Sequence, residues 1–241
     1  MNQPFRNAMR NIVPFLNIVL IFLIASRANG QQIYDFSRRN IDAHIDLIPL
    51  GFPDPSIRFG SEMMFGNRWA AGLNLGVGVR IPFTEALGLR QQMWEKGKYK
   101  LFEVRPEVKF YWLKRERSGW YMAAEGLLST MSGTTGKSYH LQTNNDTLQV
   151  NFDYADFSKT KVGVTGKLGG RIFVGRRITL DLFSGIGLAR VNSNFSNYKN
   201  KSISRSDPFF EGENYVAGKR IVAHLSAGLR IGMLLWSEEP K

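Results

Sequence analysis

The stretch ITLDLFSGIGLARV, which runs from Ile178 to Val191, alternates large apolar side chains with small or polar ones. Successive side chains of a β-strand point to opposite faces, so a period of two predicts a strand with one apolar and one polar face. Two of the polar positions carry charges, Asp181 and Arg190. The stretch therefore predicts a strand that separates two very different environments.

The same alternation returns along most of the chain and predicts eight strands in all. Two of them, Ile41–Leu50 and Pro55–Phe65, have weaker patterns. Besides Ile178–Val191, the others are Trp69–Ile81, Phe102–Trp112, Trp120–Leu128, Val162–Val174 and Ile221–Leu235. After Gln32, a helical period of 3.6 occurs only between Thr84 and Glu95, whose flanks indicate a loop. The sequence thus predicts an all-β fold.

The connections between these strands alternate in length. Short turns are predicted at 66–68, 114–119 and 175–177, and long polar connections at 82–100, 131–159 and 192–219. The first connection, GFPDP, is brief. Short turns at one rim and long loops at the other are typical of an up-and-down transmembrane β-barrel. We therefore expect eight antiparallel strands in a closed barrel, with both of its ends on the short-turn side.

The first thirty residues have the features of a secretory signal peptide. Arg6 and Arg10 precede a short apolar run, and Gly30 ends a small-residue cleavage motif. A membrane anchor, the alternative, needs about 20 apolar residues. We expect a signal peptide over 1–30, a short periplasmic segment over 31–40, the barrel over 41–236 and a C-terminal tail over 237–241.

Composition limits the classes of function. The 241 residues include no cysteine, which excludes a disulfide framework and thiolate metal sites. The formal charge is +12, and removal of three basic residues with the signal peptide, Arg6, Arg10 and Arg27, leaves +9. Basic proteins often bind nucleic acid, but an exported chain rarely meets any. We therefore expect no nucleic-acid partner.

The polar faces of the strands favour a barrel in lipid over a water-soluble sandwich with a solvated polar face. They mix glycines with charges of both signs, which suits a narrow, crowded interior. Buried charges are stable only when paired, so we predict a charge network in the lumen. Its members are Glu62, Arg80, Glu103, Arg105, Glu107, Lys109, Glu125, Lys167, Arg171, Asp181 and Arg230. The strand phase also places Asp42, Asp46, Arg58, Lys161, Arg190 and Arg220 inside.

Aromatic residues gather beside the short turns and at the end of the last strand. They are Phe65, Trp69, Trp112, Trp120 and Trp236. Aromatic side chains are enriched at membrane–water interfaces, so these five predict an interfacial belt at one rim. Ordinary packing in a core is the alternative.

Three segments carry a resemblance to a known family. They are IRFGSEMMFGNRWAAGLNLGVGV over 57–79, YKLFEVRPEVKFYW over 99–112 and AHLSAGLRIGMLLW over 223–236. In these the chain resembles the small eight-stranded outer-membrane β-barrels of the OmpA/OmpX type, within a Gram-negative subgroup of unassigned function. The resemblance implies residence in the outer membrane, contact with its lipid and lipopolysaccharide, and insertion by the barrel-assembly machinery.

Candidate chemistry is sparse. His224 and Ser226 lie two residues apart on one strand face and could form a base and a nucleophile, but we expect them to belong to the lumen. Asp42, His44 and Asp46 could bind a metal, although the chain has only two other histidines. We therefore expect no catalytic residue, no metal and no cofactor.

The sequence thus predicts an outer-membrane β-barrel with a plugged, charged lumen and long outward loops. Its expected role is structural or in surface interaction, with an extracellular ligand that the sequence does not identify. The alternatives are a lipid-modifying enzyme similar to the lipid A deacylases, and a narrow solute channel.

Overall fold

A computed structural model describes the chain over residues 40–46, 54, 56–78, 99–115, 117–142, 145–175, 177–205 and 216–237. Among these residues, none lies in a helix that is long and apolar enough to cross a membrane. The predicted signal peptide, Arg80 and the stretch from Thr84 to Glu95 lie outside the described residues.

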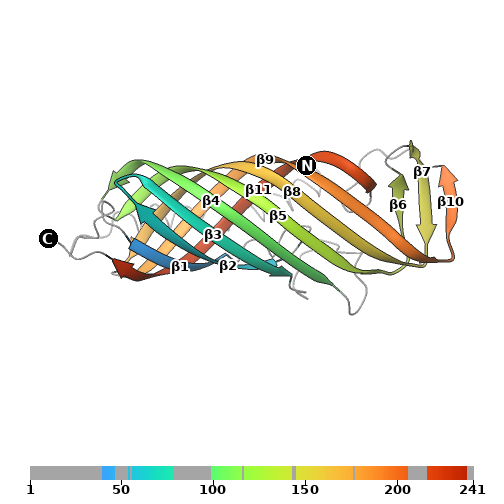
Figure 1. Ribbon diagram of the computed structural model, residues 1–241, viewed down its shortest axis with the longest axis horizontal. Coiled ribbons are helices and arrows are strands. Elements are labelled where there is room, and N and C mark those ends of the chain that lie inside the picture. The colour runs from blue at the N-terminus through green and yellow to red at the C-terminus, as the bar shows by residue number, and fades with distance from the viewer. Residues whose placement is uncertain are drawn as a thin grey trace, which may run out of the picture.

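Eight antiparallel strands close into a ring (Figure 1). In ring order they are β1 (Asn40–Asp46), β2 (Ser56–Phe65), β3 (Trp69–Gly78), β4 (Lys100–Arg115), β5 (Ser118–Thr135), β8 (Tyr154–Val174), β9 (Ile178–Lys199) and β11 (Val216–Ser237). The pairing of β1 with β11 completes the ring, so neither strand leaves an open edge there. The predicted all-β ring of eight antiparallel strands is therefore confirmed.

Three further strands extend the sheet beyond one end of the ring (Figure 1). They are β6 (Ser138–Gln142), β7 (Asn145–Phe152) and β10 (Ser202–Arg205), and β7 pairs with both of the others. The sequence predicted loops over 131–159 and 192–219, which is wrong for much of both ranges. The strands β6 and β10 are short and mostly polar, and the alternation of Leu148, Val150 and Phe152 in β7 lies within a long polar connection, so it was not recognised as a strand.

The short turns lie at the opposite end of the ring. Gly66 and Gly175 have φ angles of 63° and 67°, a left-handed conformation that glycine adopts without the steric cost of a side chain. The turn between β4 and β5 is tighter than the predicted 114–119, because β4 continues to Arg115 and β5 begins at Ser118. Asn40 pairs with both Met64 and Ser237, so β1 begins and β11 ends at this same rim.

The outer face of the ring is strongly apolar. Large aliphatic side chains such as Val164, Ile186 and Leu225 are more than 60% exposed. The five aromatic residues predicted as a belt are also on the outside and exposed: Phe65, Trp69, Trp112, Trp120 and Trp236. A water-soluble protein normally buries such side chains. In this ring they lie on the outside instead.

The apolar outer face ends at a continuous boundary toward the β6–β7–β10 extension. On each of five strands, the last outward-facing apolar residue is followed by a polar residue two positions closer to the extension. The pairs are Phe102 and Lys100, Leu128 and Thr130, Val162 and Thr160, Leu188 and Arg190, and Ile221 and Lys219. The register links these positions, because Leu128 pairs with Val162 and Arg190 with Ile221. The apolar surface is thus a band that runs from the aromatic residues to this boundary.

Arg190 corrects the sequence-based assignment of faces. It was predicted to lie inside, but its side chain is exposed on the outer face, where its neighbours across the sheet are Val162 and Ile221. The reason is that the polarity of a residue indicates whether its surroundings are polar, but not whether it lies on the inner or the outer face of the ring. Beyond the boundary of the band the outer face is polar as well, so a charge there does not indicate the lumen.

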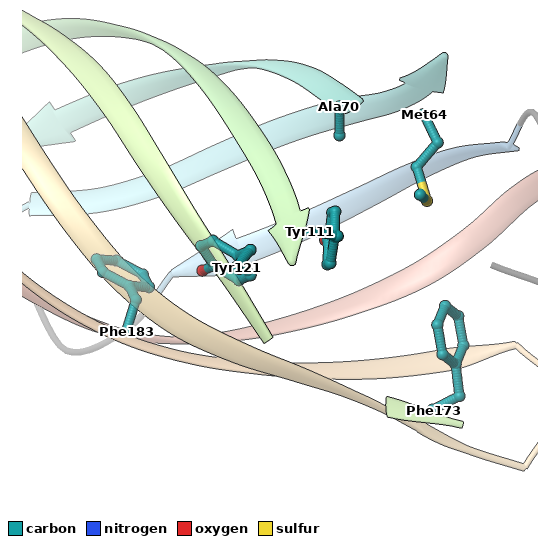
Figure 2. Packing of buried hydrophobic residues seen from close by; sticks show 6 residues of the cluster. All are labelled: Met64, Ala70, Tyr111, Tyr121, Phe173 and Phe183. Atoms are coloured by element: carbon teal, nitrogen blue, oxygen red, sulfur yellow. The ribbon is translucent and has the colours of Figure 1, made fainter. Parts of the chain in front are cut away.

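Apolar side chains fill the interior near the short turns. Met64, Ala70, Tyr111, Tyr121, Phe173 and Phe183 are buried and form one cluster inside the ring (Figure 2). The tyrosine rings contact each other at 5.4 Å between centroids. Eight strands give an interior that side chains can fill, and this cluster closes the end of the ring beneath the charged groups described next.

A second aromatic cluster lies between the extension and the end of β9. The His140 ring stacks on Phe195 with 4.4 Å between centroids, and its Nε2 is 2.9 Å from the Tyr198 hydroxyl. Burial lowers the pKa of His140, because the charged form would lose its hydration. The stacked histidine and the neighbouring Phe152 pack against Phe195 and Tyr198 of β9, so the extension shares a small core with the end of that strand.

Candidate functional site

The interior of the ring holds a dense set of charged side chains. Ten of the eleven residues predicted for the lumen network are described, and all ten are buried: Glu62, Glu103, Arg105, Glu107, Lys109, Glu125, Lys167, Arg171, Asp181 and Arg230. Asp42, Asp46 and Arg58 are buried among them. Every strand of the ring except β3 contributes a charge, and β3 contributes Asn74. We refer to these fourteen residues as the lumen network.

Arg171 is the centre of the network at the short-turn end. Its guanidinium makes a two-pronged contact with Glu62, with both N–O distances at 2.9 Å. It also donates to Asp42 at 2.6 Å and to Asp181 at 3.3 Å. One planar cation with several donors therefore holds three carboxylates that come from three different strands.

Lys109 bridges two of the same carboxylates from the other side. Its Nζ lies 2.7 Å from both Glu62 and Asp181, and 4.2 Å from the centroid of the Tyr121 ring. The Tyr121 hydroxyl donates to Asp181 at 2.6 Å. The absence of a side chain at Gly169 allows this, because a Cβ there would lie 2.4 Å from the tyrosine hydroxyl.

The middle of the network is built around Glu107 and Glu125. Arg230 donates to Glu107 at 2.6 Å, and Lys167 lies 3.1 Å from Glu107 and bonds Glu125 as well. The Phe183 ring lies beneath both cations, at 4.2 Å from Lys167 Nζ and 4.4 Å from the Arg230 guanidinium carbon. These cation–π contacts add attraction where water is excluded.

The upper part of the network faces the extension. Arg105 donates to Glu103 at 2.8 Å and to Glu125 at 2.9 Å, so it joins this part to the middle. Arg58 donates to Glu103 at 2.9 Å and lies 3.7 Å from Asp46. Glu103 also accepts from Ser56. Glu103 and Glu107 therefore act as ion-pair partners of different cations, as the predicted charge network requires.

Sequence reasoning grouped His44 with Asp42 and Asp46 but did not identify Asn74, Tyr111 and Tyr121 as members of this interior. His44 lies 3.1 Å from Asp42 through Nδ1 and 2.7 Å from the Asn74 side-chain oxygen through Nε2. Asn74, Tyr111 and Tyr121 lie at inward-facing positions in the alternation of their strands, and this alternation could have identified them. No three residues among those described form a group that could hold a metal. Asp42, His44 and Asp46 lie in the ion-pair and hydrogen-bond network instead.

Beyond the network, toward the extension, lies a cavity of about 230 Å³. We call it the upper cavity. Its polar lining consists of Asp54, Arg58, Glu103, Arg105, Ser129, Lys161, His224 and Ser226. His224 and Ser226, the two weak catalytic candidates, thus lie inside the ring, as their phase predicts.

Comparison with known proteins adds no relative to this description. No family model matches the chain, and no curated protein and no solved structure shows significant similarity to it. The likeness to small eight-stranded barrels therefore rests on the ring of eight antiparallel strands. Neither a subgroup nor an activity follows from that likeness, because one fold can serve many functions.

Proposed function

We propose that this chain is an outer-membrane β-barrel protein with a plugged lumen, exported by its N-terminal segment and active through the end that carries β6, β7 and β10. The observation that supports it best is the inverted polarity of the ring. Its charges are inside and paired, whereas its outer face is an apolar band with aromatic residues along one rim. Hydrocarbon is the environment that such an outer face fits.

The dimensions of the strands agree with this proposal. A strand needs about 9–11 residues to cross a bilayer at the usual tilt. The strands β8 and β9 have 21 and 22 residues, so each is long enough to cross and to continue into the extension. The outer face changes from Leu188 to Arg190 partway along β9, which would mark the level where this strand leaves the hydrocarbon.

The orientation follows from the usual arrangement of such barrels. Their short turns face the periplasm and their long connections face the exterior. The turns beside Gly66 and Gly175 would then be periplasmic, and the β6–β7–β10 extension would stand outside the cell. A structural role, or contact with a surface or partner through the extension, fits this placement.

The experiment that tests the proposal is membrane fractionation of the expressed chain in a Gram-negative host. We expect the protein in the outer-membrane fraction, resistant to extraction with alkaline carbonate, and faster in a gel when the sample is not boiled. Closed barrels resist detergent at room temperature because every ring strand is paired. Recovery in the soluble periplasmic fraction, with the same gel mobility before and after boiling, would refute the proposal.

A solute channel is the first alternative, and it predicts ion flow through the lumen. The paired side chains of Arg171, Lys109 and Arg230 cross the interior, and an eight-stranded ring leaves little room beside them. We expect negligible conductance when the purified protein is inserted in planar lipid bilayers. A steady open pore with the wild-type chain would show that the network does not block the lumen.

A lipid-modifying enzyme is the second alternative, and it depends on His224 and Ser226. Acyl chains would meet the outer face of the barrel, where Ala223, Leu225 and Ala227 alternate with the two candidates. The histidine and the serine line the upper cavity. Because their side chains point away from the surface that lipid would cover, we propose no catalytic role for them.

A further inference from the structure

The upper cavity is lined by cations that are themselves well buried. Arg58, Arg105 and Lys161 are 7%, 4% and 6% exposed, and all three contribute to the wall. Arg58 and Arg105 pair with carboxylates of the lumen network, and Lys161 has a partner as well, yet all three also border the cavity. The cavity also borders Ser129 and Ser226, whose hydroxyls can donate hydrogen bonds. The wall is therefore rich in donors.

The two carboxylates of the same wall already have partners for every oxygen. Glu103 accepts from Arg58 and Ser56 on one oxygen and from Arg105 on the other. Both oxygens of Asp54 accept from Lys159, at 2.7 and 2.5 Å. The residues that line the cavity include three cations, Arg58, Arg105 and Lys161, and these two carboxylates, so the lining carries one net positive charge. Asp46 and Glu125 lie behind Arg58 and Arg105, and Lys159 lies behind Asp54.

Ser226 provides an independent observation. Its side chain is 5% exposed, it borders the cavity, and its hydroxyl has no hydrogen-bond partner among the described residues. Buried hydroxyl groups are nearly always bonded, so an unbonded one calls for a physical reason. A ligand with acceptor oxygens in the cavity would supply the missing bond.

From this arrangement we infer that the upper cavity is a binding site for one small oxyanion, of the class of inorganic phosphate or a short carboxylate. The charge of the ligand would complement Arg58, Arg105 and Lys161, and its oxygens would accept from Ser226 and Ser129. The volume of about 230 Å³ is below that of sites for drug-sized molecules, which start near 300 Å³. The inference depends on the barrel interior and not on insertion in a membrane.

Isothermal titration calorimetry with sodium phosphate would test this site in the folded, full-length protein in detergent. Sodium chloride at matched ionic strength serves as the blank, because surface charges respond to salt alone. We expect saturable binding of one phosphate per chain. Lys161→Gln should weaken it about tenfold or more, since bonds to charged groups are the stronger ones. Ser226→Ala should weaken it roughly two- to tenfold.

Two control measurements distinguish binding in the upper cavity from a general effect of surface charge or of misfolding. Lys100→Gln removes the same charge from an exposed position on the outer face and should leave phosphate affinity unchanged. Ser226→Ala should leave the unfolding midpoint without phosphate unchanged or higher, because its hydroxyl has no bond to lose. The inference is overturned by an absence of saturable binding, by an equal effect of Lys100→Gln, or by a lower midpoint for Ser226→Ala. None of these results changes the result expected from membrane fractionation, so the binding site and the proposed function are tested separately.

Discussion

Replacement of Arg171 by methionine is expected to lower the free energy of unfolding by about 3–5 kcal/mol, the cost of removing one partner from a buried ion-pair set. Methionine has a similar length but no charge. Asp42, Glu62 and Asp181 would keep their negative charges in the interior and lose the cation that holds them together. Urea unfolding of the protein in detergent micelles, followed by the gel shift between folded and unfolded chains, measures this difference.

Arg115→Met is the matched control. It makes the same chemical change at an exposed position beside a short turn, where substitutions usually change stability by no more than about 0.5 kcal/mol. Arg171→Lys should fall between the two, because lysine keeps the charge but lacks the planar fork that contacts Glu62 twice. If Arg171→Met costs no more than Arg115→Met, the network contributes nothing to stability and water must reach these carboxylates.

The ring could be predicted from the sequence because one physical rule applies to all eight strands. Where one face of a strand is apolar and the other is polar, the side chains alternate, as from Ile178 to Leu188. The strand β10 of the extension could not be predicted in this way. Both faces of β10 are exposed, so its sequence, SISR, carries no contrast between them. Its pairing with Asn151 and Val150 of β7 depends on contacts far away in the chain.

The interior was predictable as a set of residues but not as a set of pairs. Strand phase placed Arg171, Asp181 and Glu107 inside, since each lies on the polar side of its strand. The partners depend on the register between strands and on the closure of the ring. Arg171 and Asp42 are 129 positions apart and meet only because β1 pairs with β11. No local pattern holds that information.

The same reasoning accounts for the upper cavity, which the sequence did not predict. Its wall combines Arg58 from β2, Arg105 from β4 and Ser226 from β11, which are not sequence neighbours. Each is unremarkable by itself: two cations of a lumen network and a small residue at an inward position. Only their arrangement around one space, with a hydroxyl that lacks a partner, suggests a ligand.

Ile186→Arg provides the second large expected effect, and it tests the apolar band directly. Ile186 is 66% exposed on the outer face of β9, where it pairs with Gly166 and Leu225. If lipid covers this face, arginine there should lower the free energy of unfolding in lipid vesicles by about 2–4 kcal/mol, the cost of such a charge near the middle of a bilayer. Urea unfolding of vesicle-inserted protein gives the value.

Asn194→Arg, farther along the same strand, is the matched control. Asn194 is exposed and lies beyond Arg190, on the polar side of the boundary, so arginine there should cost no more than about 1 kcal/mol. In water an exposed arginine is harmless at both positions, because no side chain would have to leave solvent. A difference between the two variants therefore requires hydrocarbon at Ile186 and water at Asn194, and equal values would mean that the apolar band does not lie in a membrane.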